Sequence, residues 1–295
     1  MTENTIETTQ HLAVFDNIQS ILNQTLAEKY VKAHTNKANE GINSGFYDLD
    51  RITKGFHPGE LTTIVVRPGI GKTAFLLSLV DNVAITGDYS AGILSGRRPA
   101  NQIVSRLIAS STGLSVNKIN SGELSDFESN KVNIALNNLY KARLYIDDTT
   151  NPTLNQVVEN ARQMAKGGVD IIFIDYLERI INTGSEPDCE DDICVIMKTL
   201  HALAKEINIP IILFSELKRP VLYKNKYKYT PDSVNDHTDS LIFLNRPDYY
   251  HINAIDKKEK GTAEVTIAKH KNIGDDMELI SLRIIESLDK FVNLN

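Results

Sequence analysis

The sequence is poor in cysteine, with only Cys189 and Cys194. They lie five positions apart in an acidic stretch without a neighbouring Cys or His pair. This pattern favours reduced thiols and excludes a disulfide scaffold and a zinc site. The seven histidines are scattered, and no pair has the spacing of metal ligands on a helix. No nucleophile–histidine–acid arrangement can be identified in the sequence either, so a catalytic triad is not expected.

Long apolar runs are also missing. No stretch approaches the length of a membrane span, and the polar, acidic N-terminus does not resemble a signal peptide. We therefore expect a cytoplasmic protein with no membrane partner. Positive charge is not in excess: 32 Lys and Arg face 38 Asp and Glu, a net charge of −6. Phosphate contacts favour basic surfaces, so this balance weighs against a broadly basic nucleic-acid binder but still allows a local basic channel.

The 295 residues suit one large α/β domain with an appendage, and 41% hydrophobic residues are enough for a core. Residues 8–33 predict an amphipathic helix, because Phe15, Ile18, Leu22 and Leu26 recur at three- and four-residue steps. Residues 34–41 are polar and read as a linker. The apolar stripe of such a helix must dock on the chain's own core or on a neighbouring subunit, and the sequence alone does not decide between them.

After this linker, predicted strands and helices alternate. This order implies a mostly parallel twisted sheet with helices on both faces, and two final strands joined by a turn predict a C-terminal β-hairpin. The predicted strands cover 61–66, 91–94, 144–146, 169–174, 209–214, 263–268 and 278–285. The predicted helices cover 73–85, 102–111, 126–141, 153–166 and 192–206, with Thr153 as a cap.

The strongest motif follows the first apolar strand and opens a helix, which is the context of a phosphate-binding P-loop. In such a loop the glycines let backbone N–H groups curl around a phosphate, and the helix presents its positive end there. The lysine supplies a point charge to the β- and γ-phosphates, and the threonine offers a hydroxyl to Mg²⁺. Val66 stands where the motif usually has its first glycine. The candidate nucleotide-binding residues are Arg67, Pro68, Gly69, Ile70, Gly71, Lys72, Thr73 and Ala74.

Asp175 is the candidate partner of this loop. It follows the apolar strand over 169–174, and the carboxyl ends of strands are where ligands bind in open α/β sheets. A carboxylate there can hold the water shell of Mg²⁺, so Thr73 and Asp175 are the predicted metal-binding residues, and Lys72, Thr73 and Asp175 the predicted catalytic ones. The alternative is that Asp175 only caps the next segment.

Several stretches together resemble the motor domain of the DnaB-type replicative helicases, in order and spacing over about residues 41–295. The likeness rests on 41–50, 67–73, 145–148, 174–177, 203–206, 267–269 and 290–294. The resemblance implies a RecA-like P-loop NTPase core that binds ATP and Mg²⁺. It also implies a ring-shaped hexamer that hydrolyses ATP between subunits and moves along single-stranded DNA. Residues 1–40 resemble the family's linker helix, which docks on the adjacent subunit, and are too short to contain its larger N-terminal domain.

Three positions depart from this family. Arg97 stands where the resemblance places a catalytic Glu, and a cation cannot accept a proton from the attacking water. Glu216 replaces a Gln that senses the γ-phosphate, and Lys271 replaces an Arg finger that acts in the neighbouring site beside Lys269. We expect an ion pair between Arg97 and Glu216 across the catalytic site, with two independent solvent-facing side chains as the alternative.

Two loops would line the pore of such a ring. One interleaves tyrosines with the basic residues Lys218, Arg219, Lys224, Lys226 and Lys228, which suits single-stranded DNA because cations track phosphates and rings stack on bases. The alternative is a charged loop that only contacts solvent. The other, residues 185–192, is strongly acidic and would repel phosphate.

Three functions therefore remain open. The first is a DnaB-family ATPase that helps unwind DNA in replication, with weakened hydrolysis. The second is a non-hydrolysing relative that binds nucleotide and joins, scaffolds or inhibits a helicase ring. The third, a RecA- or KaiC-like ATPase without a helicase role, is disfavoured by the family-specific first and last segments.

Overall fold

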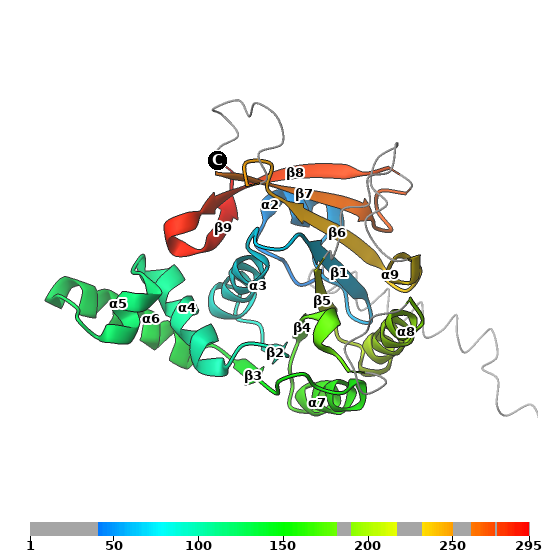
Figure 1. Cartoon of the computed structure of the whole chain (residues 1–295), viewed down its shortest axis with the longest axis horizontal. Helices are drawn as coiled ribbons and strands as arrows, with labels where there is room; N and C mark the ends of the chain where they lie inside the picture. Colours follow the sequence, from blue (N-terminus) through cyan, green and yellow to red (C-terminus); the bar gives the residue numbers. More distant parts are fainter. Residues whose placement is uncertain (1–40, 182–189, 217–231, 250–260, 275, 295) are drawn as a thin grey trace, which may run out of the picture. The chain divides into compact units, whose positions relative to one another are not determined.

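The computed structural model describes residues 41–181, 190–216, 232–249, 261–274 and 276–294 (Figure 1). The predicted N-terminal helix over 8–33 and its linker lie outside the described residues. The chain divides into two units, Met1–Glu40 and Gly41–Asn295, and the second contains all the structure described below. Within the described residues, no helix is both long and apolar enough to cross a membrane.

A mixed sheet forms the centre of the second unit. Its nine described strands are ordered β3-β2-β4-β5-β1-β6-β7-β8-β9. The first six of these are parallel: β3 (Leu144–Asp147), β2 (Ala91–Ser95), β4 (Ile171–Asp175), β5 (Ile211–Glu216), β1 (Leu61–Val66) and β6 (Ser240–Asn245). The last three are antiparallel: β7 (Thr262–Lys269), β8 (Glu278–Ile285) and β9 (Lys290–Asn293).

This arrangement confirms the predicted α/β class, the mostly parallel sheet and the hairpin formed by β7 and β8. Two strands were not predicted. β6 joins the parallel part of the sheet to the hairpin, and β9 continues the sheet beyond it, so the hairpin does not end the sheet.

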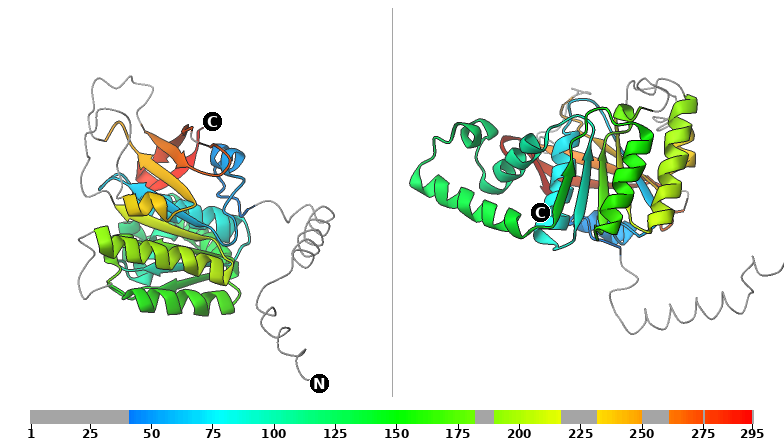
Figure 2. Two further views of the ribbon diagram at one scale, coloured as in Figure 1. Left: turned by 90° about the vertical axis from the view of Figure 1, so that its right-hand side faces the viewer. Right: turned by 90° about the horizontal axis from the view of Figure 1, so that it is seen from below.

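Helices cover both faces of the sheet, as predicted. One apolar cluster contains Ile64 and Val66 of β1 together with Phe75 of α3 (Lys72–Val80). The other contains the intervening Val65 with residues of α7 (Leu154–Lys166) and α8 (Glu190–Ile207), which lie side by side (Figure 2). Successive strand residues point to opposite faces, and every residue of β1, including Thr62 and Thr63, is buried, so both faces of this strand are covered.

The remaining helices are short or peripheral. α2 (Tyr47–Thr53) precedes β1, and α3 continues into a π-helix, η1 (Asp81–Thr86). Three helices lie together between β2 and β3 in sequence: α4 (Ala100–Thr112), α5 (Val116–Ser121) and α6 (Asp126–Lys141) (Figure 1). Short elements complete the unit: η2 (Leu177–Arg179), α9 (Asp232–Asp236) and η4 (Glu286–Leu288). Thr153 caps α7 as predicted, since its side chain accepts a hydrogen bond from the backbone N–H of Gln156.

Three aromatic rings fix the helix that carries the site. Phe75 of α3 stacks on Phe46, with ring centroids 5.3 Å apart, and meets the edge of Phe291 of β9 at the same centroid distance. All three side chains are fully buried. The start of the unit, the first helix after β1 and the last strand are thereby joined around one contact.

Candidate nucleotide-binding site

The glycine-rich segment forms the turn between β1 and α3. Gly69 and Gly71 adopt φ values of +80° and +107°, a region that favours glycine. A Cβ on Gly71 would lie 3.2 Å from the Phe291 ring, and one on Gly69 would lie 2.8 Å from the hydroxyl of Tyr249. Both the backbone conformation and the close neighbours therefore require glycine here, and the turn leads directly into the N-terminus of α3 at Lys72.

The other candidate residues of this segment divide by exposure. Ile70 and Ala74 are buried in the core, so they can offer only backbone groups to a ligand. Arg67 is partly exposed, Pro68 is exposed, and Thr73 is 8% exposed at the first turn of α3. Phosphate binding at a helix N-terminus uses backbone N–H groups, which this geometry makes available.

Lys72 is held by carboxylates at the ends of two neighbouring strands. Its Nζ lies 3.2 Å from Oδ1 of Asp175, which ends β4, and 3.6 Å from Oε2 of Glu216, which ends β5. The ammonium also lies 2.8 Å from the centroid of the Tyr176 ring. Burial lowers the pKa of Lys72, and the charges of Asp175, Glu216 and Glu178 oppose that shift. Although these charges are close, Lys72 Nζ is buried without a hydrogen-bond partner of good geometry.

Glu178 adds a third carboxyl group behind this lysine. Its Oε1 accepts hydrogen bonds from Ser215 Oγ at 2.6 Å and from the backbone N–H of Glu216 at 2.9 Å, whereas Oε2 is buried without a partner. Burial raises the pKa of Glu178, against the lowering effect of those hydrogen bonds and of Lys72. The sequence prediction did not include Glu178, although its place three residues after Asp175 was a usable signal.

The predicted ion pair between Arg97 and Glu216 is not formed. Arg97 is exposed in the turn after β2, and the carboxylate of Glu216 pairs with Lys72 instead. The reason is the strand order, because β4 lies between β2 and β5. Two strand spacings, about 10 Å, separate the ends of β2 and β5. The idea that Asp175 caps the next segment is also wrong: Tyr176 precedes η2, and no side-chain cap bond is made there.

The neighbouring Arg98 reaches the P-loop instead. Its Nε donates a hydrogen bond to Thr73 Oγ1 at 3.3 Å. A second arginine, Arg106 of α4, pairs with Asp289, and its Nη1 is buried without a partner. Burial and the charge of Arg98 lower the pKa of Arg106 to about 10, while Asp175 opposes the shift. These two arginines line a polar cavity of about 560 Å³, together with Asn101, Gln102, Ser105, Val116 and Asn120.

The residues predicted to hold Mg²⁺ are already engaged by cations. A hydroxyl and a carboxylate are the oxygen donors that Mg²⁺ takes, usually together with phosphates of the substrate. In this structure Thr73 Oγ1 accepts from Arg98, and Asp175 Oδ1 faces Lys72. Among the residues described, no group of three or more His, Cys, Asp and Glu side chains could hold a metal ion. In this arrangement both donors contact cations of the chain, and Mg²⁺ could bind them only after Arg98 and Lys72 moved away.

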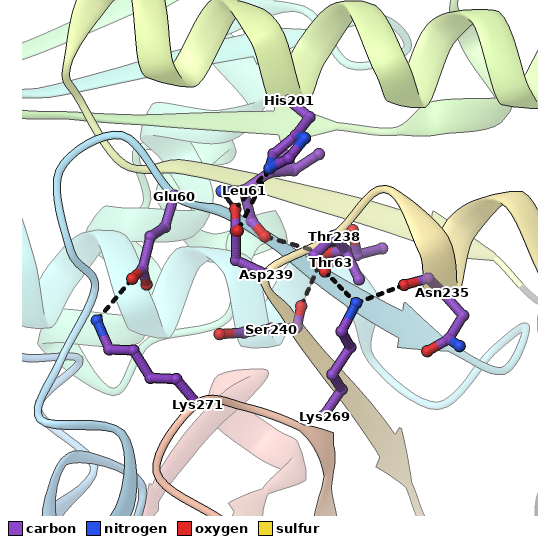
Figure 3. A network of polar contacts seen from close by, with 10 residues as sticks. All are labelled: Glu60, Leu61, Thr63, His201, Asn235, Thr238, Asp239, Ser240, Lys269 and Lys271. Atoms are coloured by element: carbon purple, nitrogen blue, oxygen red, sulfur yellow. Dashed lines mark hydrogen bonds and ion pairs between the residues drawn. The ribbon is translucent and has the colours of Figure 1, made fainter. Parts of the chain in front are cut away.

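The two lysines predicted to act on a neighbouring site are held by their own chain. Lys269 Nζ donates to the backbone carbonyls of Asn235 and Thr238 at 2.7 Å each, and Lys271 Nζ pairs with Glu60 at 2.6 Å (Figure 3).

These lysines lie near the end of the strands opposite the P-loop. Lys269 pairs with Leu241, near the start of β6, and β6 runs parallel to β1. Leu241 is level with Thr63 of β1, and the P-loop follows the other end of β1, beyond Val66 and about 10 Å further along the strand. Neither lysine therefore reaches the P-loop of its own chain.

The DNA-binding candidates Lys218, Arg219, Lys224, Lys226 and Lys228 lie outside the described residues, as does residue range 185–189 of the acidic loop. Cys189 lies there as well. Cys194 is a free cysteine of α8, and its Sγ is 3.7 Å from Nε2 of His237.

Comparison with known proteins identifies the family. The model of the DnaB-like helicase C-terminal domain matches residues 41–293. The replicative DNA helicase DnaB of Geobacillus stearothermophilus is 32% identical over 293 residues, which is 97% of this chain and 63% of that protein. The replicative DNA helicase DnaC of Bacillus subtilis is 31% identical over 294 residues, with the same coverage. The chain thus spans less than two thirds of the length of these relatives.

Solved structures agree with this assignment. A DnaB-like replicative helicase, described with its interactions with primase, superimposes with a TM-score of 0.80 and 26% identity over 94% of this chain and 69% of that one. A second structure, described as an ATPase domain, gives the same TM-score and identity over 93% of this chain and 99% of that one. The RadB recombinase, at a TM-score of 0.53 and 13% identity over 86% of this chain and 100% of that one, shares the RecA-like fold alone. The chain described here belongs to the family of DnaB-like helicase C-terminal domains.

Proposed function

We propose that this chain binds ATP in the turn that joins β1 to α3, as the motor domain of a DnaB-family protein in DNA replication. One observation carries the proposal: the buried ammonium of Lys72 lies at the N-terminus of α3, beside two glycines with positive φ, and its ion pairs leave it without a hydrogen bond of good geometry. A phosphate chain would provide the missing partners, because phosphate oxygens accept from an ammonium and from the free N–H groups of a helix end.

The proposed roles of the two units of the chain are those expected for the family. Residues 41–295 would form the ATP-binding domain, and residues 1–40 a docking helix and linker that joins a neighbouring subunit in a ring. Lys269 and Lys271 lie near the end of the strands opposite the P-loop. This position supports a role for them in the nucleotide-binding site of a neighbouring subunit. Single-stranded DNA is the proposed ligand along which the protein would move, and the basic loop at 218–228 would contact it. The proposed compartment is the cytoplasm.

Hydrolysis is expected to be weak. The exposed guanidinium of Arg97 stands where the family has its catalytic Glu, and it cannot take a proton from water. Glu216 replaces the γ-phosphate-sensing Gln, and its carboxylate would repel a γ-phosphate once Lys72 turned toward the nucleotide. Thr73 and Asp175 are the donors through which Mg²⁺ would reach the site, and only after Arg98 leaves Thr73.

These same observations favour a second function, a non-hydrolysing paralogue that binds nucleotide and joins, scaffolds or inhibits a helicase ring. The test is ATP turnover with and without single-stranded DNA, on the native chain and on the double variant Arg97→Glu with Glu216→Gln. Turnover only in the double variant supports the second function, whereas robust native turnover contradicts it. Native mass measurement separates a ring from a monomer.

A further inference from the structure

Arg98 is fixed at the mouth of the P-loop by its own turn. Its backbone N–H donates to Ser95 Oγ at 3.1 Å, and Ser95 Oγ donates back to the carbonyl of Arg98 at 2.9 Å. Ser95 is buried at the end of β2. With the backbone held on both sides, the guanidinium extends to Thr73, where Nε donates to Oγ1. The backbone at Arg98 is therefore held in place, and its side chain contacts Thr73 at the start of α3.

The atom that Arg98 contacts is the one predicted to bind Mg²⁺. A magnesium ion on Thr73 Oγ1 would lie about 2.1 Å from that oxygen. Because Arg98 Nε is 3.3 Å from the same oxygen, the two cations could be at most about 5.4 Å apart. Burial and, after it, the charge of Arg98 lower the pKa of Arg106, so Arg98 lies near a second arginine. Two cations this close repel each other, so Arg98 in this position disfavours a metal ion on Thr73 Oγ1.

A guanidinium can do part of what the metal does for a phosphate chain. It carries a permanent positive charge and presents N–H donors in a planar fork that matches phosphate oxygens. From the turn after β2, the donors of Arg98 not used by Thr73 remain available to a β- or γ-phosphate bound at Lys72. Mg²⁺ also activates and positions water and oxygen ligands, which an arginine cannot do.

We propose that Arg98 takes the place of Mg²⁺ at this P-loop, so that the chain binds metal-free nucleoside triphosphate. This inference rests on the proposed function, because it requires a nucleotide in the turn at Lys72. The inference also goes beyond the proposed function, since an arginine side chain replaces the predicted metal ion. A site of this kind retains its nucleotide when free magnesium is scarce.

The test is ATP binding measured by calorimetry on the full chain, once in magnesium chloride and once in EDTA. The native chain is expected to bind with dissociation constants that agree within about threefold between the two conditions. Arg98→Met removes a charge-assisted contact and should weaken binding in EDTA by about tenfold to a hundredfold. Binding by the variant should recover in magnesium chloride, because Thr73 Oγ1 is then free for the metal.

Arg51→Met is the matched control. Arg51 is an exposed arginine of α2 that pairs with Asp48, three residues earlier, and the variant should bind ATP like the native chain in both conditions. Arg98→Gln keeps a polar side chain and loses only the charge, so it carries the test if the Met variant unfolds. Thermal unfolding of each variant establishes which of them are folded.

The results distinguish failure of the inference from failure of the proposed function. Native binding that is at least about tenfold weaker in EDTA overturns the role of Arg98 and leaves the proposed function standing. Equal binding by Arg98→Met and the native chain in EDTA does the same. No ATP binding by the native chain in either condition removes the proposed function, and the inference falls with it.

Discussion

Replacing Phe75 by Ala tests whether the aromatic contact behind the P-loop fixes the fold. Phe75 is completely buried, with one face stacked on Phe46 and a second contact with the edge of Phe291. Truncating a buried phenylalanine costs about 3–5 kcal/mol of unfolding free energy. That range includes two aromatic pairs of about 0.5–1.5 kcal/mol each. Since the partners lie at the two ends of the unit, little local rearrangement can refill the space, and we expect the upper half of the range.

The measurement is urea denaturation followed by circular dichroism, with thermal unfolding as a second probe. For a domain of this size each kcal/mol lowers the melting temperature by roughly 2–4 °C, so the upper half of that free-energy range corresponds to a fall of roughly 8–20 °C. Phe127→Ala is the control, because Phe127 on α6 is 70% exposed and should change stability by about 0.5 kcal/mol or less. A loss below about 1 kcal/mol in Phe75→Ala, or equal losses in both variants, refutes the reasoning.

Three further changes have defined expectations. Burial raises the pKa of Glu178 above its ordinary 4.5, so this carboxyl binds its proton more tightly in the folded chain than in the unfolded chain. The protonated carboxyl therefore favours the folded chain at low pH, and this contribution is lost as the pH rises above 4.5 and through the raised pKa. Glu178→Gln should therefore be more stable than the native chain at pH 8 and lose that advantage below about pH 4 in urea titrations; an advantage independent of pH contradicts this. Arg246→Ala should lose about 2–3 kcal/mol, because it leaves the largely buried carboxylate of Asp248 without its cation, and an unchanged urea midpoint would contradict this. Lys271→Ala breaks a half-exposed pair with Glu60 and should change stability by less than about 1 kcal/mol, so any loss of ATP turnover at unchanged melting temperature reports a role between subunits.

The sequence predicted the parallel core well, because most of those strands are buried on both faces and form short apolar runs; β3 at the sheet edge is partly exposed. β6 (Ser240–Asn245) has the same character, with four buried apolar residues between polar flanks, but it was not assigned. β9 was missed for a different reason: Lys290–Asn293 contains one buried apolar residue, Phe291, and its strand pairing with β8 depends on tertiary contact. Local pattern cannot supply a partner that lies elsewhere in the chain.

The site was predicted in its parts but not in its pairings. Lys72, Thr73 and Asp175 could be named because motif spacing and strand ends determine their positions. Which arginine reaches Thr73 could not, since Arg97 and Arg98 are adjacent and the turn held by Ser95 decides which one points inward. Alignment with the family drew attention to Arg97, whereas the contact is made by the residue beside it.

The opposite placement of Lys72 and Lys271 on the sheet has a practical consequence for any reaction that needs both. Such a reaction requires two copies of the chain, so specific activity would rise with protein concentration and disappear on dilution. A copy without Lys72 could still provide Lys271 to a neighbour, and a copy without Lys271 could still bind nucleotide and receive the lysine of a neighbour. Two inactive variants would then restore activity when mixed, but only at interfaces where an intact Lys72 of one copy meets an intact Lys271 of the next.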